Sequence, residues 1–245
     1  MANFIKLPIG KFYWEASLRA PLLGCGCDDE PGGASLYYQS AYDSEKRIEI
    51  PASVLYEGSL YAVEKVNITH ESTEWHSLLL PLSAESVRLS MQKISQIEYQ
   101  PETTISGCEY MFSYCQIGTL PLWSNKQLYH FKKTTVDTLI VEKETTRLRL
   151  SQLEPESIKN LVIRSPGMKK LYGYASETPF KGVVSLESVH IEQGVEIIPA
   201  YSFYGCKRLR TVTLSQTVKR IGRSAFADCH PDLQLEYIKP IEGEP

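Results

Sequence analysis

The sequence predicts a β-rich solenoid, in which short repeated segments stack as successive coils of a right-handed superhelix. The first observation is a repeat, because seven apolar positions between residues 186 and 206 recur 23 residues further along. They are Leu186, Val189, Ile191, Val195, Ile198, Phe203 and Cys206, followed by Leu209, Val212, Leu214, Val218, Ile221, Phe226 and Cys229. A period of about 20–29 residues is typical of leucine-rich repeats, whose coils bury their apolar edges against their neighbours. We therefore expect a β/α-type leucine-rich repeat solenoid.

A three-point strand signature extends this repeat over most of the chain. The pattern apolar-x-x-apolar-x-apolar recurs at irregular steps of 19 to 31 residues. Its matches are Val63/Val66/Ile68, Ile94/Ile97/Tyr99, Ile117/Leu120/Leu122, Val136/Leu139/Val141, Ile158/Leu161/Ile163, Leu186/Val189/Ile191 and Leu209/Val212/Leu214. The last two positions of each match are two residues apart, so both side chains face one side of a strand. The signature predicts about seven irregular coils whose central residues, from Val66 to Val212, form one internal stack.

The first 60 residues do not follow the repeat, and we expect an N-terminal β-rich cap over residues 1–60. Such a cap is needed because the first coil would otherwise expose its apolar edge to water. A hairpin is expected between Val54–Tyr56 and Leu60–Val63, with its turn at Glu57 and Gly58. The solenoid is assigned to residues 61–232, and residues 233–245 to a closing strand and a tail.

The C-terminal repeats resemble a known family. The resemblance is carried by Leu209-x-x-Val212-x-Leu214 and then Val218-x-x-Ile221-Gly222-x-x-Ala225-Phe226-x-x-Cys229. This pattern resembles the repeat of BspA-like leucine-rich proteins, and residues 48–63 are similar to the segment that often precedes those repeats. The likeness is strongest over residues 186–231, and no AF-x-x-C element occurs between residues 120 and 180. Proteins of this family are typically bacterial surface proteins that adhere to other proteins. The resemblance therefore implies a protein-binding role without catalysis.

Composition and charge narrow the classes of function. A net charge of −3 provides no basic stripe for nucleic acid and no attraction to an anionic membrane surface. The longest apolar run, Leu78–Leu82, is far too short to span a bilayer, so we expect no membrane insertion. The amino terminus lacks the apolar core of a signal peptide. The sequence is thus consistent with a cytoplasmic protein, or with a surface or secreted protein whose leader has been removed.

The motifs of the sequence do not indicate catalysis, a cofactor or a metal site. Cys25-x-Cys27 with the acids that follow could attract a metal, but the spacings of zinc ligands are absent, and we expect an exposed loop. His190-Ile191-Glu192 has the H-x-E order of zinc deaminases without the P-C-x-x-C half. The sequence contains no G-x-S-x-G, Walker or GxGxxG motif. We therefore expect a protein that is not an enzyme.

Two cysteines occupy one column of the repeat, at Cys206 and Cys229. Neighbouring strands lie about 4.7–4.9 Å apart, which a disulfide can bridge. Side chains in one column would, however, point in parallel. We expect small buried thiols that pack as apolar spacers, with a disulfide as the alternative.

The predicted binding surface is the outward face of the strands. If the signature residues point inward, the alternate residues face solvent, and most of these are polar. Four apolar exceptions lie on three neighbouring coils: Pro121, Trp123, Ile140 and Val162. A rim of charged and titratable residues is expected around them: Glu98, Glu142, Arg164 and His190. An apolar patch with a polar rim is typical of a protein-contact surface. The alternative is that the insertion at 165–180 folds back and covers this surface with Tyr172, Tyr174 and Phe180.

These observations predict a monomeric protein-recognition module whose protein partner the sequence does not name. One hypothesis is a bacterial cell-surface or secreted adhesion domain, as the resemblance implies. The other is a cytoplasmic leucine-rich repeat protein that neutralises or scaffolds a partner protein. A hydrolase on the same scaffold would need acidic or Ser/His groups clustered on one face, and the outward positions carry only scattered charges.

Overall fold

The computed structural model describes residues 4–9, 12–19, 32–41, 47–69, 74–81, 84–100, 108–148, 150–151, 153–171, 178, 180–192 and 194–238. The predicted fold class is confirmed, because the chain is a β-solenoid. In the residues that the structure describes it has about six turns rather than the predicted seven. The coils are not of the β/α type in the described ranges, where strands and turns occur but no helix. The chain divides into two compact units, Met1–Gln116 (unit 1) and Ile117–Pro245 (unit 2).

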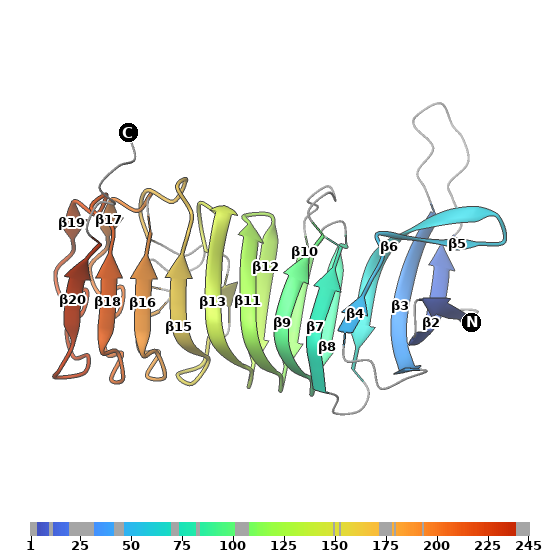
Figure 1. Ribbon diagram of the computed structural model, residues 1–245, viewed down its shortest axis with the longest axis horizontal. Coiled ribbons are helices and arrows are strands. Elements are labelled where there is room, and N and C mark those ends of the chain that lie inside the picture. Colours follow the sequence, from blue (N-terminus) through green and yellow to red (C-terminus); the bar gives the residue numbers. More distant parts are fainter. Residues whose placement is uncertain are drawn as a thin grey trace. The chain divides into compact units, whose positions relative to one another are not determined.

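Unit 1 is built from strands that form parts of two sheets (Figure 1). Its described strands are β1 (Phe4–Ile9), β2 (Phe12–Arg19), β3 (Gly32–Ala41), β4 (Arg47–Glu49), β5 (Ser53–Tyr56), β6 (Ser59–Ile68), β7 (Glu74–Leu80), β8 (Ser86–Ser90), β9 (Lys93–Tyr99) and β10 (Cys108–Ser113). One sheet runs in the order β1-β2-β3-β6-β8-β10, and the other in the order β4-β7-β9. The first pairs, β1–β2 and β2–β3, are antiparallel, whereas β3–β6, β6–β8 and β8–β10 are parallel. Parallel pairing is expected in a solenoid, because each coil brings the chain back so that its next strand runs beside the previous one in the same direction.

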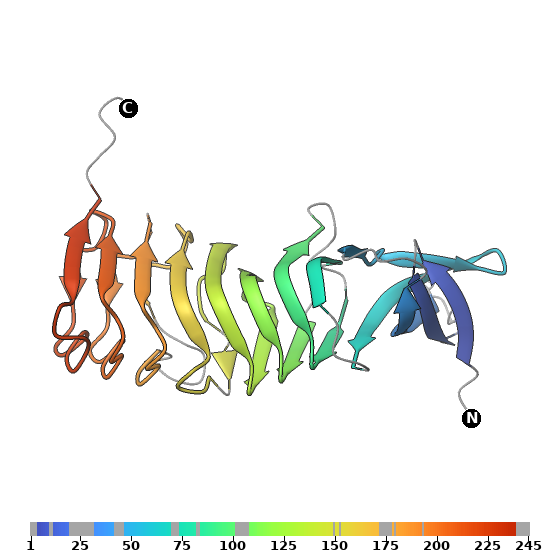
Figure 2. The same ribbon diagram turned by 60° about the horizontal axis from the view of Figure 1, so that its bottom comes forward.

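The predicted hairpin is confirmed. Strand β5 pairs with β6 in antiparallel register, with Tyr56 opposite Ser59 and the turn at Glu57 and Gly58. Both turn residues have positive φ (48° and 80°), the combination required by the tight turns that match the twist of two strands. In both views the tip of the hairpin projects beyond the neighbouring strands (Figures 1 and 2). Strand β6 crosses residue 60, and the division between a cap and a solenoid at that residue stays a prediction.

Unit 2 contains the parallel sheet that carries the predicted surface. Its described strands are β11 (Gln116–Ser124), β12 (Gln127–Lys132), β13 (Thr135–Glu144), β14 (Leu150–Ser151), β15 (Ile158–Ile163), β16 (Ser188–Ile191), β17 (Ile197–Ile198), β18 (Thr211–Leu214), β19 (Arg220–Ile221) and β20 (Gln234–Tyr237). The main sheet of this unit, here called the front sheet, runs in the order β11-β13-β15-β16-β18-β20. Its strands from β13 to β20 run parallel and side by side (Figures 1 and 2). Away from the front sheet, β12 pairs with β14 and β17 pairs with β19.

The inner face of the front sheet forms the predicted stack. Leu139, Leu161, Val189 and Val212 are register partners on four successive strands, and each is 1% exposed or less. The neighbouring inner row, from Val141 to Leu214, is equally buried. Stacked aliphatic rows of this kind bury apolar surface continuously, which is the main stabilising contribution in a repeat protein.

The prediction that Val66 belongs to this stack was wrong. Val66 lies on β6, which belongs to the other sheet of unit 1 and pairs there with β3, β5 and β8. The strand that precedes Ile97 in its own sheet is β7, and Leu78 is the register partner of Ile97. Val66 is still fully buried, because both sheets of unit 1 turn an apolar face inward.

A second internal ladder consists of aromatic rings away from the front sheet. Phe180, Phe203 and Phe226 are 23 residues apart, and their rings stack at centroid separations of 5.7 and 5.3 Å. Two residues after each ring stands a residue with a left-handed backbone: Gly182 (φ 75°), Gly205 (φ 77°) and Asp228 (φ 59°). Glycine and aspartate are among the residues that tolerate this conformation best, so the same turn can recur in each coil.

Candidate functional site

The outer face of the front sheet presents rows of residues that follow the strand register. One row contains Ile140, Val162, His190, Thr213 and Glu236, each opposite the next on a parallel strand. These residues alternate with the buried inner rows, as side chains on a strand must. The alternation in the sequence therefore identified Ile140, Val162, His190 and Thr213 correctly as outward positions.

The apolar residues of the predicted surface lie on three strands of unit 2. Ile140 and Val162 are directly opposite each other on β13 and β15, and both are partly exposed. Pro121 and Trp123 lie on β11, where they are also partly exposed and alternate with the buried Leu120, Leu122 and Ser124. The backbone N–H of Trp123 donates to Oε1 of Gln127 at 3.3 Å, which fixes the end of β11 against the turn into β12. We call these four residues, Pro121, Trp123, Ile140 and Val162, the apolar patch.

The charged residues of the predicted rim are only partly brought together. Arg164 and His190 meet at Glu192, which the sequence prediction omitted. Arg164 Nε lies 3.0 Å from Glu192 Oε1, and His190 Nε2 lies 3.9 Å from the same oxygen. Glu142 is a partly exposed residue of β13. Glu98 is a partly exposed residue of β9 in unit 1, and its place in the rim stays a prediction.

Polar side chains beside the apolar patch form hydrogen bonds with one another, which sequence reasoning did not predict. Ser188 Oγ donates to Oδ1 of Asn160 at 2.7 Å, and Asn160 Nδ2 donates to the carbonyl of Asp137 at 3.0 Å. On the next position, Lys159 Nζ lies 2.5 Å from Asp137 Oδ1. These bonds join three successive coils. They engage the side chains of Asp137, Lys159, Asn160 and Ser188 within the protein, so these groups are less available to a partner than the apolar patch.

The aromatic insertion that could cover the patch is only partly described. Phe180 does not cover it, because its ring is fully buried in the aromatic ladder against Phe203. Tyr172 and Tyr174 lie outside the described residues.

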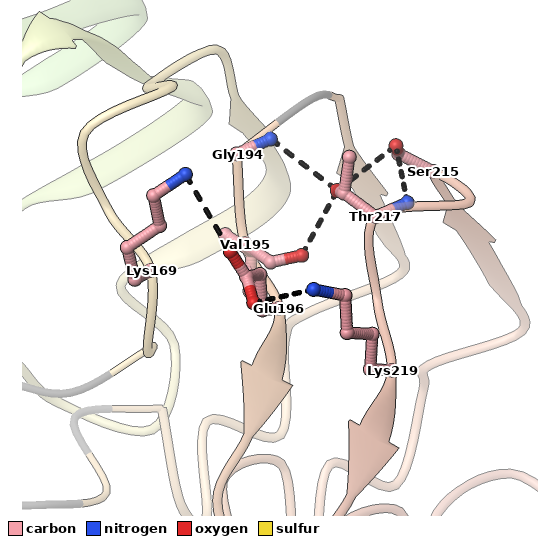
Figure 3. A network of polar contacts seen from close by, with 7 residues as sticks. All are labelled: Lys169, Gly194, Val195, Glu196, Ser215, Thr217 and Lys219. Carbon is pink, nitrogen blue, oxygen red and sulfur yellow. Dashed lines mark hydrogen bonds and ion pairs between the residues drawn. The ribbon is translucent and has the colours of Figure 1, made fainter.

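A network of polar contacts occupies the edge where the strands of the front sheet end (Figure 3). Thr217 Oγ1 accepts from the N–H of Gly194 at 3.3 Å and donates to the carbonyl of Val195 at 3.0 Å. Glu196 lies 2.9 Å from Lys219 Nζ and 3.6 Å from Lys169 Nζ. The hydrogen bond and charge of Lys219 lower the pKa of the Glu196 carboxyl. The network links residues of three coils, which is a structural role rather than a binding site.

The opposite edge, where the strands begin, contains a pocket that sequence reasoning missed. Its volume is about 280 Å³, and its lining residues are Glu187, Arg208, Arg210 and His230. They come from the turns that precede β16, β18 and β20. Residues of three separate turns converge only through the register of the coils, so spacing within any one coil gives no signal of the pocket.

The repeat cysteines are free thiols, as expected. Cys206 donates to the carbonyl of Phe180 and Cys229 to that of Phe203, both at 3.2 Å. Cys115 makes the equivalent bond to Leu89, at 3.5 Å. Each acceptor is 26 residues earlier, so the thiols tie one coil to the preceding one. Burial raises the pKa of Cys206 to about 12, which keeps this thiol protonated and unreactive at neutral pH.

The remaining motifs form no further site in the described residues. His190 and Glu192 lie on the outer face, and no three His, Cys, Asp or Glu side chains come together there or elsewhere in the described ranges as a metal site would require. Cys25 and Cys27 lie outside these ranges. None of the described segments is a helix long and apolar enough to cross a membrane.

Comparisons with known proteins agree with the repeat pattern. Residues 174–239, about a quarter of the chain, match the family described as "BspA type Leucine rich repeat region (6 copies)". No curated protein matches the chain.

Three solved structures are similar at low identity. The pneumococcal vaccine antigen PcpA is 12% identical, with 98% of this chain and 83% of that chain covered and a TM-score of 0.34. A leucine rich cell surface protein from Faecalibacterium prausnitzii A2-165 is 13% identical, with 96% and 76% covered and a TM-score of 0.39. A leucine-rich repeat protein from Bacteroides ovatus is 13% identical, with 95% and 100% covered and a TM-score of 0.24. None of these similarities is close enough to assign a function.

Proposed function

Residues 174–239 form a BspA-type leucine-rich repeat region, and from this premise we propose that the chain is a protein-recognition module. Its contact surface is the apolar patch on the outer face of the front sheet, with Arg164, Glu142 and His190 beside it. The module acts by binding a protein partner and performs no chemical step. The resemblance to BspA-like proteins supports a role in adhesion at a bacterial cell surface or as a secreted protein.

The observation that carries this proposal is the pairing of Ile140 with Val162 on a face whose other described positions are mostly polar. The two side chains are register partners, and both are partly exposed. Each 100 Å² of apolar surface that a partner covers contributes roughly 2.5 kcal/mol. Solvent-facing apolar residues that gather on one surface typically mark an interaction site.

The residues beside the patch supply specificity. Arg164 is exposed and already paired with Glu192 at 3.0 Å, so a partner carboxylate has to compete with Glu192 for its guanidinium. Exposed pairs of this kind contribute at most about 1 kcal/mol, so the exchange costs little. A charged rim therefore selects the orientation of the partner, while the apolar patch contributes most of the affinity.

Substitutions in the patch are expected to remove binding without unfolding the protein. In a pull-down from the source cells and their surroundings, Ile140→Glu and Trp123→Ala should each reduce recovery of the specific partner at least about tenfold. Ile140→Glu places a charge where an apolar contact is buried, and Trp123→Ala removes the largest apolar side chain of the patch. Melting temperatures should stay close to that of the parent protein, because both positions face outward.

The matched control is Gln216→Glu, which adds the same charge at an exposed residue of the turn after β18, away from the patch. Recovery by this variant should equal that of the parent. If Ile140→Glu and Trp123→Ala retain full recovery, or if Gln216→Glu reduces it equally, the apolar patch is not the contact surface.

A further inference from the structure

The pocket at the start of the front-sheet strands is lined by charged and titratable side chains. Glu187 precedes β16, Arg208 and Arg210 precede β18, and His230 lies in the turn before β20. Backbone bonds hold these turns in register, since Arg210 N–H donates to the carbonyl of Glu187 at 3.0 Å and Gln234 N–H donates to that of Arg210 at 2.8 Å. The pocket walls are therefore positioned by the coil stack rather than by mobile side chains alone.

The two arginines of the pocket differ in how closely they are paired with an acidic side chain. Arg208 Nη2 lies 2.8 Å from Glu187 Oε1, a direct ion pair. Arg210 Nη1 lies 3.8 Å from Asp232 Oδ2, which is too long for a hydrogen bond, and the Asp232 side chain is 79% exposed. In the described part of the chain this is the only ion pair that Arg210 makes. Its guanidinium can thus donate hydrogen bonds to the carboxylate of a ligand, and the loss of the pair with Asp232 costs little free energy.

His230 provides a further polar group. Its Nδ1 accepts the backbone N–H of Asp232 at 3.1 Å, so the neutral ring carries its proton on Nε2 and can donate from there. The side chain is 18% exposed, which makes it the least exposed of the four lining side chains; the others are 41–61% exposed. A donor on a fixed ring beside two guanidinium groups is suited to an oxygen ligand.

The geometry of the arginines favours a carboxylate. Arg208 and Arg210 contribute two positive charges, and Glu187 and the adjacent Asp232 contribute two negative charges, so these four side chains carry no net charge. A site without net charge gives a phosphate dianion no electrostatic advantage over a monoanion. Arginine binds planar carboxylates through two parallel N–H donors.

We propose that this pocket binds the carboxylate of an Asp or Glu side chain of the partner protein, with Arg210 as its main ligand. The inference rests on the proposed function, because the carboxylate is supplied by a protein partner. It names a second contact region, on the edge of the front sheet, and assigns an acidic segment to the partner.

The test is a titration with acetyl-Gly-Glu-Gly-amide, followed by NMR of the His230 ring and the Arg210 side chain. Saturable shifts are expected at about millimolar peptide. Arg210→Gln should weaken binding about tenfold, because it removes a charge-assisted hydrogen-bond donor. Glu187→Gln should strengthen binding about fivefold, because it releases Arg208 and removes the repelling charge.

Arg220→Gln is the matched control, since it removes the same charge from an exposed residue of β19 that does not line the pocket. Its affinity should stay within twofold of the parent. Equal weakening by Arg220→Gln, an unchanged affinity in Arg210→Gln, no saturable shift, or tighter binding of inorganic phosphate than of the peptide would each overturn the proposal. The titration contains no partner protein, so its outcome is independent of the pull-down that tests the apolar patch.

Discussion

Replacing Phe203 by alanine is expected to lower the free energy of unfolding by about 3–5 kcal/mol. Its ring is fully buried and lies between two others, stacked on Phe180 at 5.7 Å and on Phe226 at 5.3 Å. The rings are nearly parallel, at 7° and 2°. Truncation removes both stacking contacts and leaves a cavity between two coils that cannot close, because backbone bonds hold the coils at a fixed spacing. Urea unfolding followed by circular dichroism measures this loss.

Phe226→Ala is the matched control, since it removes the same ring from the end of the ladder. Phe226 is partly exposed and stacks on one ring only in the described residues. Its truncation should therefore cost clearly less than that of Phe203. Equal losses for the two variants would show that stacking on both sides of Phe203 adds no stability.

Gly222→Ala is expected to cost at least about 3 kcal/mol, although it adds one methyl group. A Cβ atom at this position would lie 2.2 Å from the backbone nitrogen of Ala200 and 2.6 Å from the carbonyl carbon of Pro199. Both obstructing atoms are backbone, and Gly222 N–H donates to the carbonyl of Ile198 at 2.7 Å, so the two coils cannot separate without losing that bond. The close approach of successive coils thus explains why the repeat has glycine at position 222.

Gly58→Ala tests the same substitution without the obstruction. Gly58 has φ of 80°, and a Cβ atom added there would meet no heavy atom within 4 Å. Only the backbone penalty applies there, about 1–2 kcal/mol. Thermal unfolding of the two variants should therefore show a much larger loss for Gly222→Ala, and a smaller loss than for Gly58→Ala would contradict the coil contact.

The strongest part of the sequence prediction was the region where the repeat is regular. Register pairs such as Val189 with Val212 follow directly from the 23-residue period. The prediction failed at Val66 because unit 1 contains parts of two sheets, and a strand with one buried face has the same spacing of apolar residues in each of them. Trp75, Leu78 and Leu80 of β7 carry that spacing too, 19 residues before Ile94, Ile97 and Tyr99. Spacing alone does not tell which of two candidate strands joins a given sheet.

For the proposed binding surface, the sequence predicted only which side chains face outward. Alternation along β13 and β15 was enough to place Ile140 and Val162 on the outer face. The pairing of Arg164 with Glu192 was not predictable, because the two residues are 28 positions apart and meet only when an irregular coil closes. The pocket at Arg210 required the register of three turns at once, which no local pattern encodes.

The central claim is that a protein partner binds the outer face of the front sheet. It is tested most directly by placing a photo-reactive phenylalanine analogue at residue 140, with residue 220 on β19 as the comparison site. Irradiation in the presence of material from the source cells and their surroundings should produce a discrete covalent adduct from position 140 and none from position 220. Adducts of equal yield from both positions, or from position 220 alone, would contradict the claim.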